Sequence, residues 1–401
     1  MIYDTARDWR EATEKRVLFY GMSGLGKTHL STLLRDAGDW FHYSIDYRIG
    51  TRYMGELIVD NAKAHAMQVP FLRELLLSDS IYIGSNVSFH NLAPVSTYLG
   101  KPGDPAKGGM PIEEYRRRQD QFRRAEINAL MDTGYFIERS ERLYGYPHFV
   151  CDTGGSICEW VDGDDPDDPI LTELSAHCLL VHIEGSEAHT AELIRRFDRA
   201  PKPMAYQPEF LDTAWNDYLR ENNCKADEVD PDSFIRATYA RALAHRHPRY
   251  RAMVPWGVSI TADEVGSVRD EADFEQLIAL ALERREQVIT VNRLAEEFRG
   301  SVPRLQRRIT QIADGFGEGD LSPLQGYYLS QMSVNAERIR RNPGAMLRGG
   351  MGNLTAADRL GSSSQSLRDI LDSLLGDGPV DVAPIDNAEA REQLRSIDEN
   401  F

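Results

Sequence analysis

The sequence predicts an α/β fold in which a parallel five-stranded sheet is sandwiched by helices. Short apolar runs alternate with longer helical or polar stretches, and this alternation is typical of a parallel sheet with helices on both faces. The runs are Val17–Tyr20, Trp40–Ile45, His148–Cys151, Cys178–Ile183 and Gly257–Ile260. A glycine-rich loop follows the first run, and a helix is predicted after it over His29–Asp36.

That loop, Gly21-Met22-Ser23-Gly24-Leu25-Gly26-Lys27-Thr28, fits the pattern GxxxxGK[ST]. Such a loop surrounds a phosphate with backbone N–H groups at a helix N-terminus. Lys27 would reach the terminal phosphates, and Thr28 would offer its hydroxyl to Mg²⁺. The sequence therefore predicts a P-loop protein that binds ATP and Mg²⁺. The predicted cofactor-binding residues are Gly21, Ser23, Gly24, Leu25, Gly26, Lys27, Thr28 and His29.

Composition limits the function classes. The chain has 401 residues, 41% of them hydrophobic, and a net charge of −17. An acidic surface makes nucleic acid or an anionic membrane an unfavourable partner. The four cysteines lack zinc spacing, and we find no signal-peptide core and no membrane-spanning run. We therefore expect a soluble, cytoplasmic protein.

The chain is predicted to divide near residue 285. Residues 1–285 would form a P-loop kinase-like domain with a helical insertion at about 54–115 and a lid region at about 197–240. Residues 286–401 would form a mainly helical extension with an acidic, mobile tail.

Two aspartates stand where predicted strands end. Asp46 follows the second apolar run, and Asp152 follows the third, directly before Thr153-Gly154-Gly155-Ser156. Ligands of open parallel sheets bind beyond the carboxyl ends of the strands. Asp152 is thus a candidate Walker B-type carboxylate that would hold the metal together with Thr28.

Several short motifs, in this order, resemble the shikimate kinase family of P-loop small-molecule kinases. They are Phe41–Ile49 (F-x-D-x-D-x-x-I), Phe122–Glu126 (F-R-x-x-E), Thr153–Ser156 (T-G-G-G), Arg199–Met204 (the arginine-bearing lid) and Arg246–Tyr250 (R-x-P-L-Y). The resemblance covers about residues 15 to 285.

The resemblance implies roles for individual residues. Asp46 would orient an acceptor hydroxyl and accept its proton. Arg123 and Arg246 would hold an anionic acceptor, and Arg199 would act from the lid. Gly154 and Gly155 would let the acceptor lie against bare backbone. With Lys27 and Asp152, this gives the predicted catalytic set Lys27, Asp46, Asp152 and Arg199.

The sequence also departs from the family pattern. Ser44 stands where the family has the first aspartate of its D-x-D pair, so Asp152 would replace that carboxylate at the metal. Asp46 and Arg123 are 77 positions apart, which suggests a different or larger acceptor. Each role has a structural alternative: Asp46 as a helix N-cap, Arg123 as a solvated surface charge, and Arg246 as a helix C-terminal cap.

We thus expect an ATP-dependent phosphotransferase that moves the γ-phosphate to an anionic or hydroxylated small molecule. One alternative is an ATPase whose nucleotide cycle regulates a partner complex, docked through the C-terminal extension. Another is a nucleotide kinase, with which the arginine-rich segment at residues 116–124 is compatible.

Overall fold

The computed structural model describes residues 1–286. The C-terminal extension predicted over residues 286–401 therefore lies outside the described residues, except for residue 286. Residues Met1–Glu283 form one compact unit.

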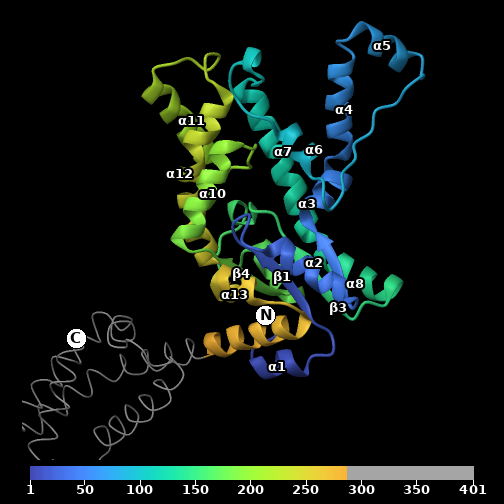
Figure 1. Cartoon of the computed structure of the whole chain (residues 1–401), viewed down its shortest axis with the longest axis vertical. Coiled ribbons are helices and arrows are strands. Elements are labelled where there is room, and N and C mark those ends of the chain that lie inside the picture. The colour runs from blue at the N-terminus through green and yellow to red at the C-terminus, as the bar shows by residue number, and fades with distance from the viewer. Residues whose placement is uncertain (287–401) are drawn as a thin grey trace, which may run out of the picture. The chain divides into compact units, whose positions relative to one another are not determined.

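A five-stranded parallel sheet forms its centre (Figure 1). The strands are β1 (Arg16–Tyr20), β2 (Trp40–Ser44), β3 (His148–Asp152), β4 (Leu179–Glu184) and β5 (Gly257–Thr261). Their order across the sheet is β2-β3-β1-β4-β5, and every neighbouring pair is parallel. All five predicted strands and the predicted fold class are confirmed.

Helices account for most of the other described residues. The α-helices are α1 (Ala6–Glu11), α2 (Lys27–Ala37), α3 (Ile45–Arg48), α4 (Gly55–Ala66), α5 (Pro70–Leu77), α6 (Ala93–Leu99), α7 (Ile112–Met131), α8 (Thr133–Tyr144), α9 (Pro169–His177), α10 (Glu187–Arg199), α11 (Pro208–Asn222), α12 (Pro231–Ala252), α13 (Ala262–Ser267) and a helix at residues 271–286. Short π- or 3₁₀-helical turns are η1 (Ile49–Tyr53), η2 (Pro105–Lys107), η3 (Ile157–Glu159) and η4 (Val254–Trp256).

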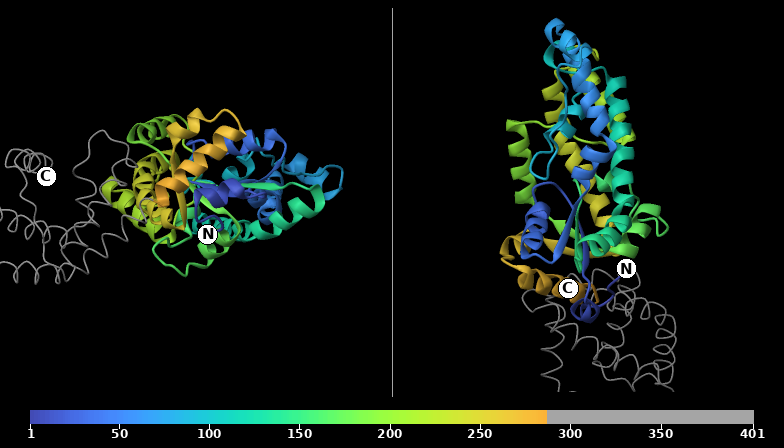
Figure 2. Two further views of the ribbon diagram at one scale, coloured as in Figure 1. Left: turned by 90° about the horizontal axis from the view of Figure 1, so that it is seen from below. Right: turned by 90° about the vertical axis from the view of Figure 1, so that its right-hand side faces the viewer.

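The region predicted as an insertion forms α4, α5, α6, their loops and the start of α7. Helices α4 and α5 extend away from the sheet in two perpendicular views (Figures 1 and 2). Three apolar side chains near the tip are largely exposed: Phe71 by 69%, Leu77 by 71% and Tyr82 by 93%.

The region predicted as a lid is built into a second hydrophobic cluster. Tyr115 of α7, Trp215 of α11 and Phe234 of α12 are buried together there. Phe197, near the end of α10, stacks on Tyr239 of α12. In this structure the lid region is therefore a packed layer of helices.

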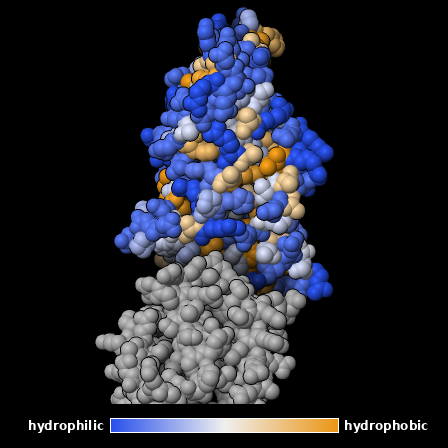
Figure 3. Space-filling model, turned by 90° about the vertical axis from the view of Figure 1, so that its left-hand side faces the viewer, coloured by the Kyte–Doolittle hydropathy of each residue, from blue (hydrophilic) through white to orange (hydrophobic). Residues whose placement is uncertain are grey.

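The side shown in Figure 3 is largely hydrophilic, with scattered apolar residues. Among residues 1–286, no helix has both the length and the apolar character needed to cross a bilayer.

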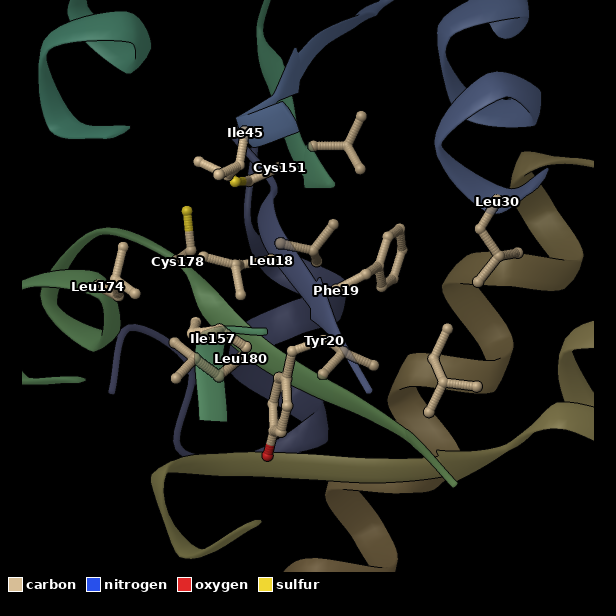
Figure 4. Close-up of a cluster of buried hydrophobic side chains, with 14 of the residues drawn as sticks. Leu18, Phe19, Tyr20, Leu30, Ile45, Cys151, Ile157, Leu174, Cys178 and Leu180 are labelled. Carbon is tan, nitrogen blue, oxygen red and sulfur yellow. The ribbon is translucent and has the colours of Figure 1, made fainter. Parts of the chain in front are cut away.

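The main core lies on both faces of the sheet. On one face, Phe19 of β1 points toward Leu30 of α2, whereas Leu174 of α9 lies on the opposite side (Figure 4). Phe274, from the helix at 271–286, meets Phe19 and Trp40 edge to face on the α2 side. This packing fixes the strand ends at which the candidate site is built.

Candidate functional site

A cavity of about 350 Å³ opens at the carboxyl ends of β1, β2 and β3. Most of the predicted site residues line it: Ser23, Gly24, Gly26, Lys27, Thr28, His29, Asp46, Asp152, Gly154 and Gly155. Of the other predicted residues, Gly21 and Leu25 belong to the same loop but do not line the cavity.

The phosphate loop curls because its glycines adopt backbone conformations that side chains resist. Gly21, Gly24 and Gly26 all have positive φ, and Gly26 is the N-cap of α2. A Cβ on Gly21 would lie 2.6 Å from the carbonyl oxygen of Ile183 in β4, so the loop can sit this close only with glycine there. The Nζ of Lys27 donates to the carbonyls of Gly21 (2.7 Å) and Met22 (2.9 Å).

Thr28 and Asp152 form the pair expected at the metal. The hydroxyl of Thr28 donates to Oδ2 of Asp152 at 2.9 Å. Burial raises the pKa of Asp152, while the charge of Lys27 and this hydrogen bond oppose the shift. Ser44 pairs directly with Asp152 in the β2–β3 ladder. Asp152 thus lies directly opposite the β2 position at which the resemblance leads us to expect a carboxylate.

These oxygens suit Mg²⁺, a hard cation that is usually held by one or two protein oxygens together with phosphate oxygens and water. No group of three His, Cys, Asp or Glu side chains within residues 1–286 forms a metal cluster by itself. A cation at Thr28 and Asp152 would therefore need further ligands from a bound phosphate.

Asp46 lies beside the glycine loop that follows β3. A Cβ on Gly154 would meet Oδ1 of Asp46 at 2.7 Å, so bare backbone is needed at this point. Burial and then the charge of Asp152 raise the pKa of Asp46 to about 6, whereas Lys27 acts in the opposite sense. The cap of α3 is Ser44, whose side chain accepts from the N–H of Tyr47. The N-cap role considered for Asp46 therefore belongs to Ser44.

The glycine loop after β3 is held by hydrogen bonds from Arg246 and Tyr250. Arg246 is buried and donates to Oε1 of Glu159 (2.6 Å) and to the carbonyls of Gly155 (2.7 Å) and Ala205 (2.6 Å). The hydroxyl of Tyr250 donates to the same Gly155 carbonyl at 2.7 Å. Arg246 does not line the cavity, and its guanidinium instead donates to the backbone of the glycine loop.

Arg246→Ala is expected to lower the free energy of unfolding by about 3 to 5 kcal/mol, because it leaves the buried carboxylate of Glu159 without its cation. Chemical denaturation at pH 7 measures this. Arg241→Ala on the same helix is the control: this arginine is 43% exposed and pairs with Asp217, so its loss should cost less than about 1 kcal/mol. Unchanged stability with weakened acceptor binding would instead make Arg246 a ligand.

The structure does not bring two other predicted arginines to the cavity. Arg123 is 41% exposed and pairs with Asp120 on its own helix, which agrees with the surface-charge alternative. Arg199 is the last residue of α10 and does not line the cavity.

The sequence did not reveal that the insertion reaches the site. Phe89, His90 and Leu92 line the cavity. They lie in or directly after a tight turn closed by two backbone hydrogen bonds between Ser88 and Asn91. Phe89 stacks on Tyr47, with ring centroids 4.7 Å apart. No local pattern signals these residues, because the contact joins segments far apart in the chain.

Further lining residues come from segments that were already recognised. They are Thr32, Arg35, His42, Ser44 and Thr153. His42 could have been found, because side chains alternate along a strand and His42 must share a face of β2 with Ser44.

A second cavity, of about 720 Å³, lies at the ends of β4 and β5. Its lining includes Gly185, His189 of α10, Arg251 of α12 and Ala262 of α13. It adjoins the phosphate loop, because a Cβ on Gly185 would meet Leu25 of that loop at 2.9 Å.

No protein-family model and no curated protein matches this chain. Among solved structures, a shikimate kinase from Bacteroides thetaiotaomicron is similar at 16% sequence identity and a TM-score of 0.28. The match covers 69% of this chain and 98% of that one. A similarity at this level carries no argument about function, and the fold assignment rests on the strand order itself.

Proposed function

We propose that this protein is an ATP-dependent phosphotransferase that moves the γ-phosphate to a hydroxyl group of a small molecule. One observation carries the proposal: the carboxyl group of Asp46, with its raised pKa, shares one cavity with Lys27, Thr28 and Asp152. A general base works best when its pKa lies near the working pH.

The proposed role of each residue follows from its place in the lining of the cavity. The backbone N–H groups of the phosphate loop and Lys27 bind the phosphates, and Thr28 and Asp152 hold the cation. When bound, Mg²⁺ would neutralise phosphate charge. Asp46 accepts the proton of the acceptor hydroxyl as the new P–O bond forms and the bond to the ADP oxygen breaks. The second cavity, next to Leu25, is the proposed place for the nucleoside.

The surroundings of Asp46 favour a hydroxylated acceptor over a strongly anionic one. Arg123 and Arg246 are each bound to protein carboxylates, and neither lines the cavity. Arg35 does line the cavity, but it pairs with Asp36 of its own helix. The insertion contributes Phe89, His90 and Leu92 instead. We therefore propose that apolar contact and hydrogen bonds hold the acceptor.

The direct test is transfer from γ-labelled ATP to a pool of cellular metabolites, with the products separated by chromatography and identified by mass. The proposal expects a labelled organic phosphate whose formation needs both the protein and one fraction of the pool. Label released only as inorganic phosphate would contradict it.

The rate of transfer is expected to depend on pH through Asp46. Only the ionised carboxylate accepts a proton, so kcat/KM should fall about tenfold for each pH unit below about 6. A pH profile of kcat/KM with the purified acceptor checks this. A flat profile over about one pH unit on either side of that pKa would remove Asp46 as the base.

A second candidate, an ATPase that works on a partner protein, has one specific observation in its favour. The tip around α5 exposes Phe71, Leu77 and Tyr82, and exposed apolar patches often mark protein contacts. The C-terminal extension first considered for docking lies outside the described residues. ATP hydrolysis that rises on adding a protein fraction, without any labelled metabolite, would favour this candidate.

The nucleotide-kinase alternative gains no such support. The five arginines between residues 116 and 124 are each paired with a carboxylate of the protein: Asp212, Glu114, Glu114, Asp120 and Asp120 in chain order.

A further inference from the structure

His42, in β2, is a buried histidine that lacks hydrogen-bond partners. Its side chain is 3% exposed. Within the described part of the chain, neither Nδ1 nor Nε2 has a hydrogen-bond partner. Buried polar atoms are nearly always satisfied, and an exception calls for an explanation such as an unseen ion. Yet His42 is also among the residues that line the phosphate-loop cavity.

The imidazole lies next to the two groups proposed to hold the cation. Nε2 of His42 is 3.9 Å from Oδ2 of Asp152, which is too far for a hydrogen bond. The same Oδ2 is 2.9 Å from the hydroxyl oxygen of Thr28. Ligands about 2.1 Å from one octahedral cation lie about 3 Å apart when adjacent and about 4 Å apart when opposite. The 3.9 Å between Nε2 of His42 and Oδ2 of Asp152 matches two opposite ligands, and the 2.9 Å between Oδ2 of Asp152 and the hydroxyl of Thr28 matches two adjacent ones.

The ring is also held in place. Phe89, from the insertion, packs against His42 with ring centroids 5.1 Å apart. Three different elements thus contribute the donors: β2 gives an imidazole nitrogen, β3 a carboxylate and α2 a hydroxyl.

We propose that His42 is a third protein ligand of the nucleotide-bound cation, and that this protein prefers Mn²⁺ or Co²⁺ to Mg²⁺. The proposal rests on the proposed function, because it requires a nucleotide-bound cation at Thr28 and Asp152. An imidazole nitrogen binds the first-row transition-metal ions, Mn²⁺ weakly and Co²⁺ more strongly, whereas Mg²⁺ prefers oxygen donors throughout. Neither the phosphate-loop motif nor the resemblance of the sequence to a kinase family assigns a nitrogen ligand to this position.

The test is pulsed electron paramagnetic resonance of the full chain with Mn²⁺ and ADP. A directly bound imidazole gives a nitrogen modulation of the Mn²⁺ signal. We expect it in the wild type and not in His42→Gln. His90→Gln is the matched control, because His90 lines the same cavity but makes no hydrogen bond or ion pair with Asp152 within residues 1–286, and it should keep the modulation. Wild-type protein labelled with ¹⁵N-histidine should show the ¹⁵N pattern, which needs no variant to fold.

Calorimetry gives a second measurement. ADP with Mn²⁺ should bind the wild type at least about tenfold more tightly than ADP with Mg²⁺, and His42→Gln should remove most of this difference. Tight binding of Mn²⁺ and ADP without any histidine nitrogen would overturn the role of His42 and leave the proposed function intact. Failure to bind ADP with any cation would overturn both.

Discussion

Asp46→Asn is expected to abolish phosphoryl transfer while it makes the protein more stable at pH 7. The amide cannot accept the proton of the acceptor, so the rate should fall by at least about 10²-fold. ATP should still bind, since Lys27 and the phosphate loop are unchanged. Transfer of label to the acceptor measures the first effect, and calorimetric titration with ATP measures the second.

The gain in stability follows from the direction of the pKa shift. Asp46 holds its proton more tightly in the folded protein than in the unfolded chain, because burial and Asp152 disfavour the charged form. Ionisation at pH 7 therefore costs the folded state free energy, which a neutral amide avoids. A pKa raised from 3.8 to about 6 corresponds to about 1 to 3 kcal/mol at pH 7. The difference between the two proteins should vanish as the pH falls below about 4, where both states hold the proton.

Denaturant unfolding at pH 7 and again at about pH 4 tests this prediction. Asp36→Asn is the matched control, since Asp36 is 63% exposed and, among residues 1–286, pairs only with its neighbour Arg35. This variant should change stability by less than about 0.5 kcal/mol. If Asp46→Asn lowered stability, Asp46 would have a structural role. If that variant still transferred phosphate, another group would be the base.

The sheet was predictable because each strand is a short apolar run bounded by polar residues or glycine. The strand ends then followed, and with them the positions of Asp46, Thr28 and Asp152. Parallel strands bring their carboxyl ends to one edge of the sheet. That rule alone places three residues in one cavity: Asp46, Thr28, which lies 18 positions before it, and Asp152, which lies 106 positions after it.

The roles of the arginines were not predictable in the same way. Arg246 matches a short motif, but its guanidinium is bound by Glu159, 87 positions away. A motif states which residue is present, whereas its partner is set by tertiary packing. The cavity contacts of Phe89 and His90 were hidden for the same reason, since the insertion has no pattern that shows where it folds back.

Lys27→Met is expected to abolish both nucleotide binding and transfer. The Nζ of Lys27 is buried beside the phosphate loop and rests on the carbonyls of Gly21 and Met22. Burial lowers the pKa of Lys27, while Asp152 and Asp46 oppose the shift. Methionine keeps the apolar stem and removes the charge, so a triphosphate would enter a cavity in which Asp46 and Asp152 are no longer neutralised. Affinity for ATP should fall by at least about 10²-fold.

Calorimetric titration with ATP tests this. Lys63→Met is the control: Lys63 is 48% exposed on α4, so this variant should bind ATP as the wild type does. Two carbonyls lose a donor in Lys27→Met, at a cost of about 1 to 3 kcal/mol, so binding must be measured where unfolding curves show that the variant is folded. Wild-type affinity in a folded Lys27→Met protein would mean that the triphosphate binds elsewhere. In that case Asp46 would not face a γ-phosphate, and its raised pKa would need an explanation other than catalysis.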